Sequence, residues 1–353
     1  MSMTPEYPLI SIIMAAHNTE RYIGEAIQSV LDQTYTNWEL VIIDDASSDE
    51  TEAVARSFRD PRIVYEKVPH QGRPSAVRKI GFDKSRGELL LIFDSDDVLQ
   101  PTALSEMQTK LAENDHYDCV YSFMSYIDEN GSDFPAAGFK LIPDGHGGYK
   151  APDFYQHTWE RVGIFKFMAS TFLLIKRSSL DAVGGFDESL DAAEDLHLFL
   201  KLFLRDINAI GFVPNYLLKY RYNAQSLTRK KSNIEKLLRN YMRVVDWFYT
   251  NPALPAEVEP LKPIGYCKGY NYVAGVCLTC GYKMMALRIV MQALLDSRTT
   301  LSAWLKVCGT TIARCLLPRQ ADRVLKHWAV ALRDGVILNA LKSQIRSALP
   351  AKA

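Results

Sequence analysis

Short apolar runs alternate with segments of helical periodicity along the first 130 residues of the chain. The apolar runs predict buried strands, and the segments between them place apolar residues on one helical face. The predicted strands span residues 9–14, 40–43, 63–65 and 89–93, and the predicted helices span residues 23–31, 75–84 and 101–112, with one more helix capped by residues 47–49. Strands that alternate with helices in this way predict an α/β fold with a largely parallel sheet.

The pattern changes after residue 130. Residues 130–165 are rich in Gly, Pro and aromatic residues, which is typical of surface loops. Predicted strands then follow at 172–175, 209–213 and 216–222, and a predicted helix at 194–204. Beyond residue 232 the pattern is helical, with a first apolar stripe at Leu301, Trp304, Leu305, Cys308 and Ile312. We therefore expect one domain over residues 1–230, with halves at 1–115 and 116–230, and a helical C-terminal region over 231–353.

Composition narrows the class of protein. Of 353 residues, 48% are hydrophobic and 23% are charged, with 41 Lys and Arg against 41 Asp and Glu. This balance excludes disordered, collagen-like and nucleosome-binding proteins, and the chain lacks the aromatic and basic motifs of nucleic-acid-binding modules. The first residues lack the features of a signal peptide, the six cysteines are scattered, and the longest uncharged stretch, 269–282, is too short to span a bilayer. We therefore expect a reduced, cytoplasmic protein.

The charge is distributed unevenly. Residues 298–353 contain ten Lys and Arg against two Asp and Glu, so the end of the chain is basic. On a predicted helix at 321–340, Arg323, Lys326 and Arg333 lie opposite an apolar stripe of Leu325, Trp328, Leu332 and Val336. This pattern suits peripheral contact with the anionic inner face of a membrane. The alternative is that these helices pack on the rest of the protein and keep their basic face in solvent.

Three carboxylates crowd the end of one predicted strand. Asp94, Asp96 and Asp97 directly follow the strand at 89–93, and ligands of open α/β sheets bind beyond the carboxyl ends of the strands. A divalent cation would relieve the repulsion among these groups, and Mg²⁺ or Mn²⁺ prefers carboxylate and phosphate oxygens. The motif therefore indicates a cation–diphosphate site. The alternative is a solvated turn before the helix that starts at Pro101.

A second acidic turn follows the strand at 40–43. Asp44 and Asp45 come directly after the apolar run, and a carboxylate there could accept a hydrogen bond from a nucleobase N–H or a ribose hydroxyl. The alternative is a plain helix cap formed by Ser48 or Asp49. A cap does not explain why two acids stand together at the strand end.

Five ordered motifs resemble glycosyltransferase family 2. They are residues 10–18 (ISIIMAAHN), 44–49 (DDASSD), Gly72 with 76–78 (AVR) and Gly81, 93–97 (FDSDD), and 184–188 (GGFDE) followed by Glu194 and Asp195. The resemblance runs from about residue 8 to residue 228. It implies the GT-A fold, a Rossmann-like and mostly parallel sheet flanked by helices, and an inverting enzyme that uses a nucleotide-activated sugar.

The resemblance also implies a role for individual residues. The nucleoside would lie against Ala15, His17 and Asn18 with Asp45 facing the base, Arg78 would lie near the base or the diphosphate, and Asp94 near ribose or metal. Asp96 would be the main ligand of Mn²⁺ or Mg²⁺ with Asp97 beside it, and Asp195 would be the catalytic base. Glu194, Arg221 and Asn223 are candidate contacts of the diphosphate or the acceptor. Without the resemblance, Glu194 and Asp195 would be interpreted as acids that favour a helix N-terminus.

Several positions depart from the family pattern. Ala15 stands where Pro or Thr is usual, His17 where Tyr is usual, Lys79 where Asn is common, and Asn223 where His is usual. The leading hypothesis is transfer of a sugar, with UDP as the expected carrier, to a polysaccharide or glycolipid acceptor that contacts residues 130–168. Two alternatives stay open. One is a non-catalytic scaffold that binds sugar nucleotides, and the other is a nucleotidyltransferase, which would release pyrophosphate.

Overall fold

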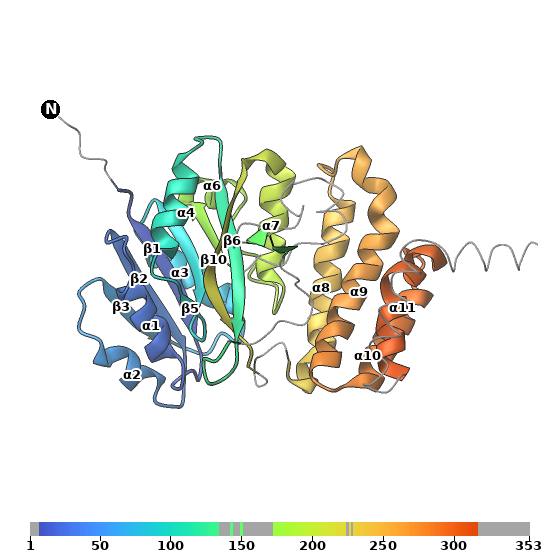
Figure 1. The fold of residues 1–353 in the computed structure, drawn as a ribbon, viewed down its shortest axis with the longest axis horizontal. Helices are drawn as coiled ribbons and strands as arrows, with labels where there is room; N and C mark the ends of the chain where they lie inside the picture. The colour runs from blue at the N-terminus through green and yellow to red at the C-terminus, as the bar shows by residue number, and fades with distance from the viewer. Residues whose placement is uncertain are drawn as a thin grey trace, which may run out of the picture. The chain divides into compact units, whose positions relative to one another are not determined.

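The computed structural model describes residues 7–133, 142–143, 149–150, 172–223, 226 and 229–316 (Figure 1). These residues divide into two compact units, one that ends at Asn223 and one that follows it. All strands of the described chain lie in the first unit, which is an α/β unit. The second unit is made of helices.

The first unit is built on an eight-stranded sheet with the strand order β3-β2-β1-β4-β9-β6-β10-β5. The strands are β1 (Ile10–Ala16), β2 (Trp38–Asp45), β3 (Ile63–Val68), β4 (Leu89–Asp94), β5 (Val98–Leu99), β6 (Cys119–Ile127), β9 (Leu173–Lys176) and β10 (Ile210–Arg221). Strands β3, β2, β1 and β4 pair in parallel, as do β6 and β10, whereas β9 is antiparallel to both of its neighbours and β5 is antiparallel to β10. A separate hairpin pairs β7 (Ile142–Pro143) with β8 (Tyr149–Lys150).

Helices cover both faces of this sheet. They are α1 (Ile23–Leu31), α2 (Thr51–Ser57), α3 (Pro74–Lys84), α4 (Ala103–Ala112), α6 (Arg177–Ala182) and α7 (Glu194–Arg205). Side chains of α1 and α4 such as Ile27 and Met107 join the main core with Ile12 of β1, whereas Val77 of α3 packs on the other face with Val41 and Ile43 of β2. The arrangement confirms the predicted α/β class with a mostly parallel sheet.

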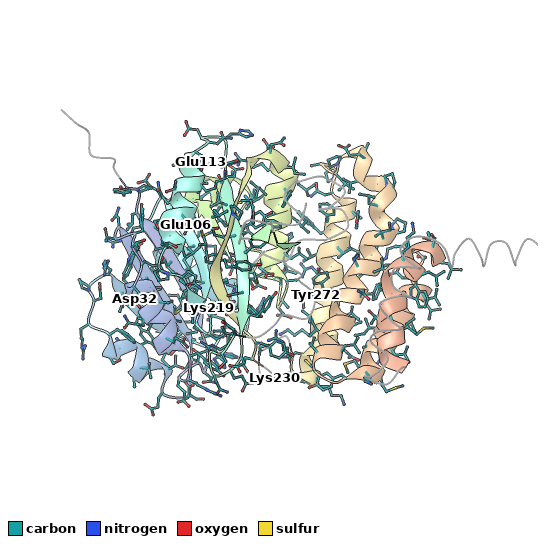
Figure 2. All side chains as sticks on the ribbon, in the orientation of Figure 1. Asp32, Glu106, Glu113, Lys219, Lys230 and Tyr272 are labelled. Carbon is teal, nitrogen blue, oxygen red and sulfur yellow. The ribbon has the colours of Figure 1, made fainter. Side chains whose placement is uncertain are left out.

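Several strands and one helix of the first unit were absent from the sequence prediction. They include β5, β6, α6 and the hairpin of β7 and β8, which falls within residues predicted as loops. Strand β6 mixes polar and aromatic residues and carries no continuous apolar run. The two strands predicted at 209–213 and 216–222 form one strand, β10, whose pairing with β6 is irregular between Val213 and Leu218. Pro214 lies at this irregularity, and proline cannot donate to a strand ladder. The side-chain amide of the next residue, Asn215, donates to Glu106 at 2.5 Å. Glu106 is labelled on α4 in Figure 2.

The second unit contains η3 (Lys231–Asn233), α8 (Ile234–Thr250), η4 (Ala256–Leu261), α9 (Lys262–Thr279), α10 (Lys283–Leu295) and α11 (Leu301–Leu316). Helix α9 packs against α8, α10 and α11. The crossing with α8 is close at Gly265, because a Cβ at this position would lie 1.7 Å from the Tyr249 hydroxyl oxygen. Helix α9 thus needs a glycine where it meets the ring of Tyr249.

The predicted apolar stripe of α11 is partly wrong. Its buried face consists of Ala303, Trp304, Val307, Cys308 and Thr311, whereas Leu301 is 62% exposed. Trp304 and Cys308 of the predicted stripe are buried, and the Trp304 indole donates to the carbonyl of Val290 on α10 at 2.6 Å. The second predicted stripe, at 325–336, lies outside the described residues. Among the helices that the structure describes, none is both long and apolar enough to cross a membrane.

Candidate active site

The carboxyl ends of β1, β2 and β4 lie next to each other at one edge of the sheet. In the pairing register, Ala16 of β1 is opposite Asp44 of β2, and Ala15 of β1 is opposite Asp94 of β4. The two acidic turns predicted from the sequence therefore flank the end of β1. This edge is where an open α/β sheet binds its ligand.

Three non-glycine residues with positive φ surround this edge. They are Asn18 (φ 51°) just after β1, Ala46 (φ 56°) just after β2, and Ala193 (φ 64°) just before α7. Left-handed backbone costs free energy for residues with a Cβ and is concentrated at functional sites. These are all the non-glycine residues of the described chain with positive φ, so the backbone strain gathers around one region.

Asp44 forms hydrogen bonds within its own turn and with β3. Its carboxylate is fully buried and accepts hydrogen bonds from the Ser47 N–H at 2.8 Å and from the Tyr65 hydroxyl. Burial and this hydrogen bond raise the pKa of Tyr65 well above its usual range. Asp44 thus stabilises the turn that carries Asp45.

Asp45 faces the loop after β3. Its carboxylate accepts hydrogen bonds from the backbone N–H groups of Gln71 and Gly72, the latter at 3.0 Å, and Nδ1 of His70 lies 3.0 Å from its Oδ2 atom. Gly72 has a φ of 68°, which glycine adopts at little cost. The predicted base-facing acid is therefore buried and held by backbone donors.

His17 and Asn18 connect β1 to the Asp45 turn. Nδ1 of His17 lies 2.7 Å from the carbonyl oxygen of Asp45. The Asn18 N–H donates to the Ser47 hydroxyl at 2.9 Å, and the Ser48 N–H donates to Oδ1 of Asn18 at 2.8 Å. The residues predicted to bind a nucleoside thus form one connected surface, with the His17 ring exposed to solvent.

Arg78 connects α3 to two acids of the site. The side chain is 5% exposed, and its guanidinium donates to Oδ1 of Asp94 at 2.7 Å and to the carboxylate of Glu194. Its Nε atom is buried and has no hydrogen-bond partner within the described part of the chain. The structure therefore places this predicted ligand contact between two carboxylates.

The three acids of the Asp94-Ser95-Asp96-Asp97 turn differ in their burial. Asp94 and Asp96 are half-buried, whereas Asp97 is 2% exposed and accepts a hydrogen bond from the backbone N–H of Arg221 at 2.8 Å. Burial raises the pKa of Asp97 well above its usual range, and the charges of Asp96 and Asp94 raise it further. A cation between these acids would offset the repulsion among their negative charges.

Arg221 braces the same turn from β10. Its Nε donates to the Asp96 carbonyl at 2.7 Å, and its Nη2 donates to Glu25 of α1 at 2.5 Å. The guanidinium also lies 4.9 Å from the centre of the Tyr22 ring. Arg221, a predicted contact of the diphosphate or the acceptor, is thus paired with a local acid in this structure. Asn223 follows two residues later and is half-buried.

Glu194 and Asp195 begin α7. Glu194 is 5% exposed and contacts Arg78, whereas Asp195 is half-buried and accepts a hydrogen bond from the Leu196 N–H at 2.7 Å. Burial raises the pKa of the Glu194 carboxyl to about 7, although Arg78 opposes this shift. The loop before α7 is tied to α3 because the Ser75 hydroxyl donates to the Leu190 carbonyl at 2.8 Å.

The site residues thus fall into three contacting groups. One contains His17, Asn18 and Asp45, a second contains Arg78, Asp94 and Glu194, and a third contains Asp96, Asp97 and Arg221. The sequence analysis missed Glu25, His70 and Ser47. Glu25 lies on α1, whereas Ser47 and His70 lie in loops between a strand and a helix. A single polar residue in either setting is a weak signal, so these contacts become evident only in the fold.

The acids at the end of β4 are suited to hold a divalent cation. The three acids of this turn offer carboxylate oxygens, which are the ligand atoms that Mg²⁺ and Mn²⁺ prefer. Asp97 is a buried acid whose repulsion with Asp94 and Asp96 a cation would offset. Asp96 and Asp94 are the half-buried members and would supply the ligand atoms.

Comparison with known proteins identifies the family. The sequence model of glycosyl transferase family 2 matches residues 11–184. An uncharacterized glycosyltransferase of Rickettsia typhi is 30% identical over 235 residues, which cover 65% of this chain and 69% of that protein. The O-antigen biosynthesis protein RfbC of Myxococcus xanthus is 26% identical over 73% of this chain and 19% of that protein. The chain belongs to glycosyl transferase family 2, and it is a glycosyltransferase.

A solved structure shares the fold. Residues 1–349 of TarS from S. aureus match with a TM-score of 0.58 and 19% identity, over 92% of this chain and 87% of that chain. The same TarS fragment has been solved in complex with UDP and with UDP-GlcNAc, with TM-scores of 0.55 and 0.56. The likeness confirms the predicted GT-A type of fold.

Proposed function

We propose that this glycosyltransferase is inverting and metal-dependent, and that it moves a sugar from a UDP-sugar to a hydroxyl group of a polysaccharide or glycolipid acceptor. One observation carries the proposal: Arg78 holds Glu194, the neighbour of Asp195, against Asp94 at the ligand-binding edge of the sheet. An acid that can accept a proton thereby lies next to a cluster that includes Asp94, an acid that can hold the cation of a diphosphate.

The choice of donor and acceptor is supported by the relatives. TarS binds UDP and UDP-GlcNAc, and the related Myxococcus protein is named for O-antigen biosynthesis. In this chain, the nucleoside would lie against His17, Asn18 and Asp45. These residues connect the ends of β1 and β2 and include the exposed ring of His17.

The proposed reaction is an in-line displacement at the anomeric carbon. Asp195 takes the proton of the acceptor hydroxyl, the acceptor oxygen bonds to the anomeric carbon from one side, and the bond to the diphosphate oxygen breaks on the other. The configuration at this carbon is inverted, and UDP leaves. A divalent cation held by Asp96 and Asp94 would neutralise negative charge on the departing diphosphate. Arg78 keeps Glu194 and Asp94 in fixed positions, which reduces the entropy cost of aligning the reactants.

The experiment that tests this proposal measures donor binding and product together. The melting temperature is recorded with UDP, GDP, dTDP, CMP and ATP, each with and without Mn²⁺, because a ligand that binds only the folded protein raises it. We expect the largest increase with UDP and Mn²⁺, and release of UDP when a matching UDP-sugar and acceptor are supplied. Release of pyrophosphate would indicate a nucleotidyltransferase. Binding without turnover over a panel of sugars and acceptors would favour the scaffold alternative.

A further inference from the structure

Two imidazole rings and one carboxylate converge beside the end of β1. Nδ1 of His17 lies 2.7 Å from the Asp45 carbonyl oxygen, and Nδ1 of His70 lies 3.0 Å from Oδ2 of the same residue. The two rings are tilted by 35° with centroids 5.2 Å apart. One ligand atom from each of the three residues lies within 4.8 Å of the other two. The loop after β1, the end of β2 and the loop after β3 thus bring two nitrogens and one oxygen within reach of one small ion.

The carboxylate of this group is fixed, whereas the rings are accessible. Asp45 is 6% exposed, and backbone N–H groups of Gln71 and Gly72 hold its two oxygens. Such outer contacts orient a carboxylate for ligation. The side chain of His70 is 59% exposed, so small rotations can bring its ring nitrogen to the approximately 2.0–2.2 Å needed for a bond to a metal. Access from solvent is open through both histidines.

We propose that His17, Asp45 and His70 form a cation site of their own, which takes a borderline ion of the Zn²⁺, Co²⁺ and Ni²⁺ class. Imidazole nitrogen suits these ions, whereas the carboxylates of Asp94 and Asp96 suit Mg²⁺ and Mn²⁺. The same edge of the sheet would therefore hold two cation sites that prefer different ions. Solvent completes the coordination, because three protein ligands leave a tetrahedral site one position open.

The ring tautomers add a second prediction about this site. In the ion-free protein, Nδ1 of each ring faces oxygens that only accept hydrogen bonds, so Nδ1 carries the proton. Ligation through Nδ1 moves that proton to Nε2. The amide Nδ2 of Asn18 lies 3.2 Å from Nε2 of His17 and, as a donor, disfavours the change. An acceptor at position 18 would favour it.

The test is a titration of the full chain with Zn²⁺ against a chromophoric chelator. We expect one ion per chain, a weakening of at least about tenfold in His17→Tyr and in His70→Gln, and a tighter complex in Asn18→Asp. His116→Gln is the matched control, because His116 is 58% exposed and also faces an aspartate, Asp206 at 2.7 Å. Wild-type affinity in both His17→Tyr and His70→Gln, or equal weakening in His116→Gln, would overturn the proposal. A weaker complex in Asn18→Asp would contradict ligation through Nδ1.

An effect on donor binding rests in addition on the proposed function. If the nucleoside lies against His17 and Asp45, Zn²⁺ and UDP exclude each other, and UDP should weaken the apparent Zn²⁺ affinity in the presence of Mn²⁺. Asp96→Ala separates the two proposals, because it should leave Zn²⁺ binding unchanged while UDP binding weakens. Loss of Zn²⁺ binding in Asp96→Ala would assign the ion to the aspartate turn and overturn the site at His17.

Discussion

Arg78 donates to Asp94 at 2.7 Å and thereby ties helix α3 to the last residue of β4. The same guanidinium contacts Glu194, 116 positions away at the start of α7. A buried charge is tolerated only when it is paired, and here both partners belong to the candidate active site. The position of the predicted catalytic base therefore depends on an arginine that contacts its neighbour.

Replacement of Arg78 by Lys should separate these two acids. An ammonium group cannot donate to two carboxylates in the planar geometry of a guanidinium. We expect the turnover number to fall by at least about tenfold and the Michaelis constant for the donor to change less, because alignment rather than charge is lost. The measurement is steady-state release of UDP. The control is Arg56→Lys on α2, because Arg56 forms an exposed salt bridge with Glu52. Equal kinetics in both variants would remove the positioning role.

Asp195→Asn should slow transfer by a large factor without loss of donor binding. A general base contributes about 100- to 10,000-fold to a rate, and Asn cannot take the acceptor proton. Calorimetry should give unchanged affinity for UDP with Mn²⁺, while turnover falls within that range. The exposed acid Asp181 on α6 supplies the control variant Asp181→Asn. Normal turnover in Asp195→Asn would exclude Asp195 as the base.

Asp96→Ala should uncouple nucleotide binding from the cation. The half-buried Asp96 would contribute a ligand to Mn²⁺, so its loss should weaken Mn²⁺-dependent UDP binding by about 10- to 100-fold. UDP binding measured with a chelator in place of Mn²⁺ should change little. If the two affinities change in parallel, the effect of the variant is structural and Asp96 is not the main ligand.

Two glycines of α9 give a matched pair for stability. Gly265→Ala brings a Cβ within 1.7 Å of the Tyr249 hydroxyl, whereas Gly275→Ala meets no atom within 4 Å. We expect the first variant to lower the free energy of unfolding by about 1–3 kcal/mol. The second should raise it by about 0.5–1 kcal/mol, because alanine restricts the unfolded chain. Urea unfolding followed by circular dichroism measures both, and equal stabilities would contradict the close crossing of α8 and α9.

Asp296 should make the second unit sensitive to acid. Its side chain is 7% exposed, and contacts with Arg298 and Tyr270 lower the pKa of its carboxyl to about 2 from a usual 3.8 despite burial. The folded-state pKa is depressed, so the stabilisation is complete above about pH 4 and is lost as the pH falls through about 2. At about 1.4 kcal/mol per pKa unit, the effect is on the order of 2 kcal/mol.

The corresponding experiment compares wild type with Asp296→Asn across pH. The variant should be less stable by this amount at pH 7, and the difference should shrink as the pH falls towards 2, because the wild-type carboxyl then takes up a proton and loses its charge. The exposed Asp115 offers a control, since Asp115→Asn should shift the free energy of unfolding by less than about 0.5 kcal/mol at any pH. A difference that persists undiminished at pH 2 would show that packing, not charge, stabilises this region.

Part of this molecule follows directly from local sequence. Strands β1, β2 and β4 are mostly apolar, and the acids that come at the ends of the apolar runs of β2 and β4 predict where these two strands end. Helix α7 was predicted from its periodicity, and its acids fall in the first turn. These features depend on residues within a few positions of one another, which is the range over which hydrophobic periodicity and capping operate.

Other features depend on residues that meet only in the folded chain. The contact of Arg78 with Glu194 and the hydrogen bond from the Arg221 N–H to Asp97 join residues 116 and 124 positions apart. Neither spacing leaves a periodic signal. The same holds for His70, whose role beside Asp45 depends on the pairing of β2 with β3. Strand β6 was not predicted because its sequence has no continuous apolar run. It forms a strand because it pairs with β9 and β10, which come later in the chain.

The antiparallel strand β9 has a consequence for the order in which the sheet is made. Its partners β4 and β6 end at Asp94 and Ile127, yet β9 itself begins only at Leu173. While a ribosome synthesises the chain, the edge of β4 that pairs with β9 stays without its partner strand until about eighty more residues are made. This takes several seconds at typical elongation rates. A nascent chain that stalls in this interval presents an unpaired apolar strand edge, so slow codons or truncations between β6 and β9 should promote aggregation.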